Sequence, residues 1–416
     1  MKPTNWRTVP LWSVATETRA AVDPSNLGDQ VVHYSIPAVD ATGTGQIEAT
    51  DSIKSAKLLL RGGEVLVSKL NPRKSRVLIV TYSPLPIVSS TEFVGLVPGA
   101  KIEPRFLAYF LQSETTRQAL DSRVQSVTRS HQRAAPEDVT HLPMCLPSLD
   151  EQRRIADFLD TETARLDRLV ALRHNLIRLS HERDSALRDG LVNDLFASEG
   201  EVPLRRLTQG IEQGDSPQCD AIPREAEEWG VLKLSAVKHG VFHPAENKRL
   251  PDHITPNSAF EVRPGDLLIT RANTPSLVGD AAIVDSSSPR LLLPDLIYRV
   301  RLVESMSADF LMHVALSGRT RSLIEAVARG SSQSMVKLRS EDIKSWPVPR
   351  ANSTQQAELV REIRHSSTQT QNLRQVVERQ ITLLNERRQA LITAAVTGQF
   401  DVSTASGRNV TEGVTA

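Results

Sequence analysis

The chain has 416 residues, of which 39% are hydrophobic and 24% charged, a composition typical of a folded protein long enough for two domains. Its net charge of +1 gives no support for nucleic-acid binding from overall charge, so any such binding must rest on local clusters. Two cysteines are too few for a disulfide framework, the longest uncharged stretch (77–91) is too short to span a bilayer, and we expect a cytoplasmic protein.

The first 147 residues are predicted to form an α+β domain. Residues 64–69 form a short β-rich run after a glycine turn, and residues 77–82 form another. Residues 104–111 have the apolar spacing of a short amphipathic helix. Because strands and helices mix without a regular βαβ alternation, the pattern favours the α+β class.

Residues 148–197 are predicted to form one long helix. Ser148 and Glu151 have the spacing of a capping box at its start. The segment holds no proline, and apolar residues then recur at intervals of three and four, as in a helix with one apolar stripe. The stripe comprises Ile155, Leu159, Leu166, Leu169, Leu172, Leu176 and Leu179.

The second half of the chain repeats this organisation. Residues 198–350 form a second predicted α+β domain, with strands at 266–271 and 281–284 and a helix at 308–315. Residues 351–400 form a second predicted helix, with either Asn352 and Gln355 or Ser353 and Gln356 at capping-box spacing near its start. The small, polar tail 401–416 is expected to be disordered. The apolar stripe of this second helix comprises Leu359, Ile363, Leu373, Val376, Ile381 and Leu384.

The two halves are related by a constant offset only in their rear parts. Six residues between 177 and 187 return unchanged 204 positions later, whereas the offset in the front parts is 193 or 202. This indicates two copies of a variable domain, each followed by a helical segment of constant length. The helices either lie on separate domain cores or pair with each other. At ~1.5 Å per residue a helix over 150–196 exceeds a domain diameter, which favours an antiparallel coiled coil between the copies.

The residue patterns of common catalytic sites are absent from the sequence. It contains no phosphate-binding Gly-x-x-x-x-Gly-Lys-Ser/Thr loop, no Gly-x-Gly-x-x-Gly and no Gly-x-Ser-x-Gly. The histidines show no metal-ligand spacing. We therefore expect a protein without catalytic residues of its own.

Basic and amide residues gather at matching places in both halves, after the first predicted strand and before the long helix. Lysine and arginine can neutralise phosphates, and arginine, asparagine and glutamine can pair with base edges. The alternative interpretation is a pair of solvated loops. The candidate DNA-binding residues are Lys69, Asn71, Arg73, Lys74, Arg76, Arg129, Arg133, Arg271, Asn273, Gln333 and Lys337.

Several segments together resemble the specificity subunits of type I restriction–modification systems over residues 5–400. Residues 146–155 (LPSLDEQRRI) are similar to the Pro-x-x-x-Glu-Gln-x-x-Ile start of the first conserved helix of that family. Residues 387–398 (RRQALITAAVTG) are similar to the ending of its second helix. Residues 34–38, 68–72 and 265–274 look like parts of its target-recognition domains. The first copy departs from the pattern at Gln125, where the second copy has Gly330.

The resemblance implies two target-recognition domains (1–147 and 198–350), joined by two conserved helical regions (148–197 and 351–400). Each domain would read half of a split site in double-stranded DNA. The helices would bind two methyltransferase subunits and, through them, restriction subunits. S-adenosylmethionine, ATP and Mg²⁺ would belong to those partners and not to this chain, which would be the non-catalytic part of an adenine-N6 methyltransferase and endonuclease complex.

Two other functions fit the residue patterns. The chain could read DNA within a different complex, or it could be a coiled-coil scaffold that binds only protein. The repeated basic segments favour DNA reading, and the low net charge favours the scaffold. The sequence does not reveal which DNA sequence is recognised, the spacer length or whether a functional restriction subunit accompanies the chain.

Overall fold

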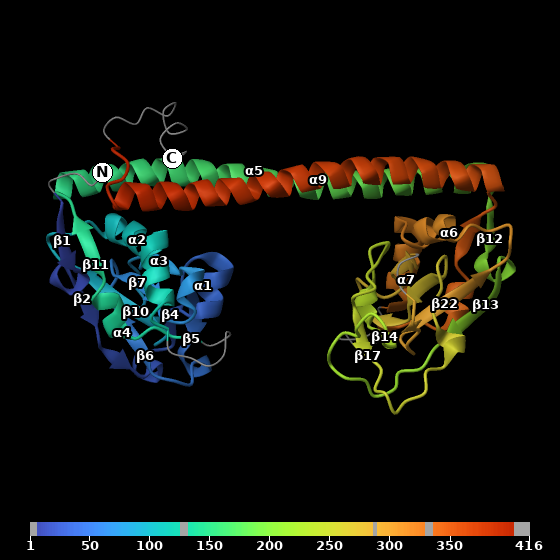
Figure 1. Ribbon diagram of the computed structural model, residues 1–416, viewed down its shortest axis with the longest axis horizontal. Helices are drawn as coiled ribbons and strands as arrows, with labels where there is room; N and C mark the ends of the chain where they lie inside the picture. The colour runs from blue at the N-terminus through green and yellow to red at the C-terminus, as the bar shows by residue number, and fades with distance from the viewer. Residues whose placement is uncertain (1–5, 125–131, 286–288, 329–335, 403–416) are drawn as a thin grey trace. The chain divides into compact units, whose positions relative to one another are not determined.

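The computed structural model describes residues 6–124, 132–285, 289–328 and 336–402 and divides into two compact units. Unit 1 comprises Met1–His174 and Val377–Ala416, and unit 2 comprises Asn175–Val376. Each unit holds one mixed domain of strands and short helices together with segments of two long helices (Figure 1). We call the mixed domain of unit 1 module 1 (residues 7–146) and that of unit 2 module 2 (residues 201–349).

Module 1 is built on two sheets. An antiparallel sheet has the strand order β2-β10-β7-β8, and a mixed sheet has the order β3-β6-β9-β4-β5. Strands β1 and β11 form a separate ribbon at the ends of the module. The elements, in chain order, are β1 (Arg7–Pro10), β2 (Ala15–Thr18), β3 (Ala21–Val22), β4 (Gln30–Tyr34), α1 (Ile36–Thr42), β5 (Gln46–Ala49), β6 (Lys57–Leu60), β7 (Val65–Ser68), β8 (Val77–Ile79), β9 (Ile87–Ser89), β10 (Phe93–Pro98), α2 (Pro104–Gln112), α3 (Glu114–Asp121), α4 (Pro136–Thr140) and β11 (Pro143–Leu146).

Module 2 repeats the first of these sheets and changes the second. Its antiparallel sheet has the order β13-β22-β18-β20, and β12 and β24 form the terminal ribbon. A small sheet of order β17-β14-β21 and the pairs β15-β16 and β19-β23 complete it. The elements are β12 (Glu201–Pro203), β13 (Thr208–Gln213), β14 (Gly230–Leu232), β15 (Val237–Lys238), β16 (Val241–Phe242), β17 (Asn247–Arg249), β18 (Leu267–Thr270), β19 (Ala272–Asn273), β20 (Ala281–Ile283), β21 (Leu291–Leu292), β22 (Ile297–Leu302), α6 (Ala308–Ala315), α7 (Gly318–Ala328), β23 (Val336–Lys337), α8 (Ser340–Lys344) and β24 (Pro347–Pro349).

The elements common to both modules carry their main cores. Phe106 and Leu107 of α2 are fully buried in module 1, and Phe310 and Leu311 of α6 hold the same places in module 2. Most strands of the sheets that differ precede the central strands β7 and β18 in the chain, and only β9 and β21 follow them. This is where the sequence offset changes, so the slip reflects different insertions on a common core.

The long helices are α5 (Leu149–Glu199) and α9 (Ser353–Val396). Each begins at a capping pattern that the sequence predicts. At the start of α5, the Ser148 hydroxyl accepts a hydrogen bond from the Glu151 amide at 3.3 Å. At the start of α9, the side chains of Asn352 and Gln355 each accept a hydrogen bond from the other's backbone amide, at 3.0 and 2.9 Å.

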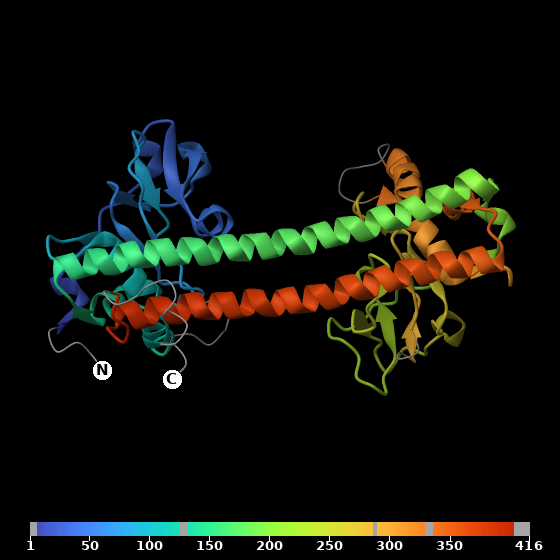
Figure 2. The ribbon, with the colours of Figure 1, turned by 90° about the horizontal axis from the view of Figure 1, so that it is seen from above.

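Within each unit, segments of α5 and α9 lie side by side and antiparallel (Figure 2). In unit 1, Arg388 of α9 forms an ion pair with Asp167 of α5 at 3.0 Å. In unit 2, the Asp184 carboxylate accepts hydrogen bonds from the hydroxyls of Ser366 and Thr370 at 2.7 and 3.0 Å. The predicted fold of two α+β domains joined by two paired helices is confirmed.

The predicted leucine seam is wrong in the middle of α5. The side chains of Leu172, Leu176 and Leu179 are 55%, 37% and 48% exposed, whereas the small polar residues Ser180 and Ser366 are buried. Small hydroxyl side chains let the helices approach. Ser180 donates to the Ile177 carbonyl and Ser366 to the Asp184 carboxylate, and these hydrogen bonds satisfy the buried hydroxyl groups. The apolar stripe therefore faces solvent at these positions instead of the partner helix.

A buried glutamine attaches module 1 to the start of α5. The side chain of Gln152 is fully buried. Its Oε1 accepts a hydrogen bond from the backbone amide of Glu103 at 2.8 Å. Its Nε2 donates to the carbonyls of Lys101 and Pro147 at 3.1 and 3.0 Å. One side chain therefore joins the helix, the loop before α2 and the segment after β11.

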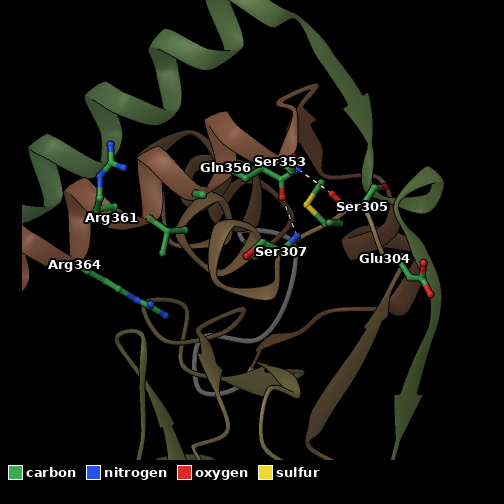
Figure 3. A pocket seen from close by; sticks show the side chains of 10 residues that line it. Glu304, Ser305, Ser307, Ser353, Gln356, Arg361 and Arg364 are labelled. Atoms are coloured by element: carbon green, nitrogen blue, oxygen red, sulfur yellow. Dashed lines mark hydrogen bonds between the residues drawn. The ribbon is translucent and has the colours of Figure 1, made fainter.

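Gln356 repeats this arrangement in unit 2. Its Oε1 accepts a hydrogen bond from the Ser307 amide at 2.8 Å, and its Nε2 donates to the Ser305 and Ala351 carbonyls at 3.0 and 2.9 Å. Figure 3 shows Gln356 between Ser305 and Ser307, beside a cavity that Arg361 and Arg364 also line. Gln356 and its three partners all lie 204 residues beyond their counterparts in unit 1, so the attachment is a true structural repeat.

The ion pair beside each glutamine has opposite polarity in the two units. In unit 1, Arg105 of α2 donates to Asp160 of α5 at 2.7 Å. In unit 2, the residues 204 positions later exchange roles, and Arg364 of α9 donates to Asp309 of α6 at 2.6 Å. Module 1 therefore presents an arginine to an aspartate of its long helix, and module 2 presents an aspartate to an arginine of its long helix.

We expect Gln152→Leu to destabilise unit 1. Leucine cannot bond to the three backbone groups, and each one left buried without a partner costs ~1–3 kcal/mol. The free energy of unfolding, measured by urea denaturation, should fall by at least that amount, with faster amide hydrogen exchange at Glu103. Gln380→Leu makes the same substitution on an exposed face of α9 and should change stability by less than about 0.5 kcal/mol. Equal losses in both variants would contradict the anchoring role.

Candidate nucleic-acid interface

The predicted basic residues of module 2 meet on a short ribbon that continues the central strand β18. Strand β19 pairs antiparallel with β23, so that Ala272 lies opposite Lys337 and Asn273 opposite Val336. The Leu338 amide donates to the Arg271 carbonyl at 2.8 Å and extends the pairing. Residues 271–273 and 336–338, which are more than 60 positions apart, are thereby joined.

Module 1 builds the same ribbon. Leu70 forms a β-bridge with Arg133, and the Asn71 amide donates to the Gln132 carbonyl at 2.7 Å. The Ala134 amide donates to the Lys69 carbonyl at 3.0 Å, as Leu338 does to Arg271 in module 2. We call residues 69–71 with 132–134, and 271–273 with 336–338, the basic edge of each module.

The two asparagines of the basic edges differ in their surroundings. Asn71 is 9% exposed and adopts a left-handed backbone conformation (φ 50°), which asparagine tolerates better than most residues. Asn273 is half-buried, and its Oδ1 accepts a hydrogen bond from the Thr274 amide at 2.9 Å. Within the described part of the chain, its Nδ2 makes no hydrogen bond. Asn273 is therefore the better placed of the two to donate to a ligand.

Three of the predicted arginines are held by other parts of the protein. Arg76 donates to Asp40 of α1 through Nε and Nη2, the latter at 2.8 Å, and its side chain is 7% exposed. This contact holds the pKa of the Asp40 carboxyl below its usual value. Arg133 makes a bidentate pair with Glu92, which raises its pKa. Arg271 lies 5.8 Å from the centre of the Tyr298 ring and donates to a carbonyl.

The predicted lysines are the cations available to a ligand. Lys74 and Lys337 are exposed and Lys69 is half-buried. Within the described residues, their ammonium groups make no hydrogen bond or ion pair. Arg73 is exposed, and its carbonyl accepts a hydrogen bond from Arg117 at 3.3 Å. The basic edges, together with residues 73–76 of module 1, therefore combine fixed arginines with exposed or half-buried lysines.

Arg129 and Gln333 lie outside the described residues. They belong to segments 125–131 and 329–335, which immediately precede residues 132 and 336 of the basic edges.

Two further residues support the basic edges and were not predicted. Arg117 of α3 donates to the Arg73 carbonyl, and Arg321 of α7 donates to the Val278 and Pro275 carbonyls at 2.6 and 3.4 Å. Each arginine thus holds the loop that follows its basic edge. The available signal was the repeated pair Thr116-Arg117 and Thr320-Arg321 at the constant offset of 204.

Lysines from another part of module 2 also approach Asn273. A cavity of about 370 Å³ is lined by Asn273, Lys233, Ser235 and Lys238. Lys238 is exposed and, in the described part of the chain, forms no ion pair, whereas Lys233 lies 3.9 Å from Glu246. These lysines are isolated in the sequence, which gave no signal that they belong with Asn273.

The basic edges can recognise an anionic polymer but show no arrangement for catalysis. Their donors are amide, ammonium and guanidinium groups, which suit phosphates and base edges. Among the described residues, no group of three or more His, Cys, Asp or Glu side chains is placed to hold a metal ion. No helix in the same residues has the length and apolar character needed to cross a membrane.

Comparisons with known proteins agree on one family. Residues 3–177 match the family described as type I restriction modification DNA specificity domain. The type I restriction enzyme EcoEI specificity subunit of Escherichia coli is 31% identical over 147 residues, which cover 35% of this chain but 25% of that protein. The EcoKI specificity subunit of Escherichia coli strain K12 is 22% identical over 430 positions, covering 96% of this chain and 90% of that protein.

A solved structure has the same fold. A chain from a study of complex assembly and conformational transition in a type I restriction–modification system matches with a TM-score of 0.70 and 20% identity. The match covers 96% of this chain and all of that chain. At this identity the likeness concerns the fold alone, and it extends over both modules and both helices.

We expect Arg76→Gln to loosen the loop between β7 and β8. Glutamine cannot make the bidentate contact with Asp40, so the loop loses its attachment to α1. Amide hydrogen exchange over residues 69–76 should accelerate, and the melting temperature of unit 1 should fall. Lys74→Gln removes a neighbouring charge that makes no such contact and should leave both quantities unchanged. If the two variants behave alike, Arg76 does not hold the loop.

Proposed function

Since the chain belongs to the specificity subunits of type I restriction–modification systems, we propose that each of its modules reads one half of a bipartite site in double-stranded DNA. DNA sequence recognition is the role of the chain within such a system, and it is a non-catalytic subunit. The proposal adds which part of the chain reads DNA and how the work is divided between the units.

One observation carries the proposal: the basic edge is built twice from segments far apart in the sequence. The same backbone hydrogen bond closes it in both modules, from Ala134 to Lys69 and from Leu338 to Arg271. A solvated charged loop would need no such matched pairing. Two similar surfaces, each on its own module, are what a protein needs to read two separate half-sites.

The side chains of the basic edges, and of residues 73–76 that follow the edge of module 1, suit different parts of DNA. Lys74 and Lys337 are exposed ammonium groups, which bind phosphates as point charges. Asn273 can offer its Nδ2 donor to a base edge, in the way that asparagine recognises adenine. Arg76 and Arg133 are engaged by Asp40 and Glu92, so we assign them to shaping the edge.

We further propose that each unit binds one methyltransferase subunit through exposed apolar residues of its helices. In unit 1, Leu172 and Leu383 are each 55% exposed. The ion pair between Asp167 and Arg388 sets their register, because one leucine lies five residues after the aspartate and the other five before the arginine. The two leucines therefore lie at the same level of the helix pair.

Unit 2 presents the equivalent pair. Leu179 and Val376 are 48% and 56% exposed, and each is 204 residues from its counterpart in unit 1. Large apolar side chains exposed together mark protein-binding surfaces. Two matching patches support two identical partners. We assign S-adenosylmethionine to these partners, and ATP and Mg²⁺ to restriction subunits that join through them.

Asn273→Ala should relax recognition of one half-site. Losing a base contact costs ~1–3 kcal/mol at the affected position, and the other half of the methylated motif should remain required. Lys337→Ala should instead weaken binding to all sequences and reduce the slope of log affinity against log salt by about 1. Methylome sequencing and binding titrations over a range of salt concentrations measure these effects for the chain with its methyltransferase.

Lys344→Ala is the control for both variants, because Lys344 of module 2 bonds to Glu341 and lies outside the basic edge. It should change neither the motif nor the salt slope. Equal degradation of both half-sites by Asn273→Ala would show that this residue does not read a base. Absence of duplex binding by the wild-type chain, with partner binding intact, would favour a protein-only scaffold.

The double variant Leu172→Ser, Leu383→Ser should weaken one partner site and leave the other intact. Interface residues of this kind contribute more than 1 kcal/mol each when central, so affinity should fall at least about fivefold. Leu179→Ser with Val376→Ser should do the same for the second site, and native mass spectrometry would count bound subunits. Leu323→Ser, at an exposed position of α7, is the control. Unchanged stoichiometry and affinity in both double variants would contradict the assignment.

A further inference from the structure

Unit 2 contains a basic cleft between its helices and module 2. The cleft has a volume of about 740 Å³. Four arginine and lysine side chains line it, together with three histidines and only two carboxylates. The lining cations are Arg188 of α5, Arg374 of α9, and Lys238 and Arg321 of module 2.

The two carboxylates of the cleft are already satisfied by neutral donors. Asp184 accepts hydrogen bonds from the hydroxyls of Ser366 and Thr370. Asp280 is buried and accepts hydrogen bonds from the backbone amides of His239 and Ala281 at 2.7 and 3.0 Å. Neither makes a hydrogen bond to Arg188, Lys238 or Arg321 among the described residues, although both act on Arg188 through space. The charges of these three cations are therefore only partly compensated.

Arg188 is the most enclosed of these cations. Its side chain is 22% exposed, and its Nε is buried without a hydrogen-bond partner in the described part of the chain. The Asp189 carboxylate lies 3.9 Å from this nitrogen, beyond hydrogen-bonding distance. Burial lowers the pKa of Arg188. A buried donor without an acceptor is rare and usually has a reason.

The other copy of the repeat shows what this position holds when no charge is needed. The residue 204 positions after Arg188 is Ile392, which is fully buried in the apolar cluster of unit 1. Isoleucine fills this place without any polar group to satisfy. Arginine costs stability there, because its charge must be partly removed from water. The cost is explained if an anion completes the site.

The cleft adjoins the basic edge of module 2. Lys238 lines both the cleft and the smaller cavity that contains Asn273. Lys238 therefore connects the surroundings of Asn273 with the cleft that contains Arg188. The neighbouring source of anions is therefore the sugar–phosphate backbone of the DNA that module 2 reads.

We propose that the cleft around Arg188 and Lys238 is a phosphate-binding site that holds the DNA backbone next to the half-site of module 2. The proposal rests on the proposed DNA-reading function for the source of the phosphate. The guanidinium and ammonium groups would contact phosphate oxygens and read no base. Unit 2 would thereby bind phosphates of the DNA backbone outside the half-site that it recognises.

The test replaces Arg188 by the residue of the other copy. In the full chain bound to its methyltransferase, Arg188→Ile should reduce the slope of log affinity against log salt by about 1. It should leave the methylated motif unchanged and should maintain or raise the melting temperature. Lys238→Ala should also reduce the slope by about 1. Arg183→Ile removes an arginine from an exposed position of α5 and serves as the control.

A second measurement does not depend on DNA. Inorganic phosphate, compared with chloride at equal ionic strength, should raise the melting temperature of the wild-type chain but not that of Arg188→Ile. A phosphate effect with an unchanged DNA salt slope would overturn the DNA source and leave a site for a free phosphate group. Loss of stability in Arg188→Ile, with no change in salt slope or phosphate response, would overturn the site itself. Wild-type chain that responds to phosphate but binds no duplex would overturn the DNA-reading function instead.

Discussion

In each unit, the hydrogen bonds of one buried glutamine attach the module to its long helix and so position the surfaces that the module carries. Gln152 and Gln356 each bind three backbone groups from two different segments. Backbone partners make this contact independent of the side chains around it. A module can therefore change its surface residues and keep the same attachment to the helix, provided that its backbone returns to the same place.

The division between constant and variable parts follows from this attachment. The elements nearest the glutamines, α2 and α6, begin 204 residues apart, and each buries a phenylalanine at the matching position. The second sheet of each module lies between other strands and differs in strand number and order. Insertions there do not disturb the glutamine contact. The basic edges lie at the end of the constant central strands β7 and β18, so they are positioned by the constant core even though their surroundings differ.

Local patterns predicted the elements well, and long-range contacts account for what was missed. The starts of α5 and α9 followed from capping residues three positions apart, because such contacts are local. The roles of Arg76 and Arg133 did not, since their partners Asp40 and Glu92 are 36 and 41 residues away. The leucine stripe near Leu172 was predicted to face the other helix, and this prediction was wrong. A single sequence cannot show which face of a helix a partner will cover.

The candidate site was half predictable for the same reason. The clusters at 69–76 and 271–273 were visible as charged or amide runs, and their repetition indicated that they matter. Their pairing with residues 132–134 and 336–338 depends on strand contacts across more than 60 positions. Arg188 gave no signal by itself. Its significance emerges only from comparison with Ile392, the residue 204 positions later, which the structure shows to be buried.

The reversed ion pairs at Arg105 and Asp309 limit how such a chain can be rearranged. The two helix starts offer the same glutamine contact, so by shape alone either could receive either module. By charge they differ, because Asp160 stands where the other helix has Arg364. A module copied from the first position into the second would bring arginine against arginine. Duplication of one module into both places, which would turn a split asymmetric target into a palindrome, therefore requires a compensating change of sign at a single residue.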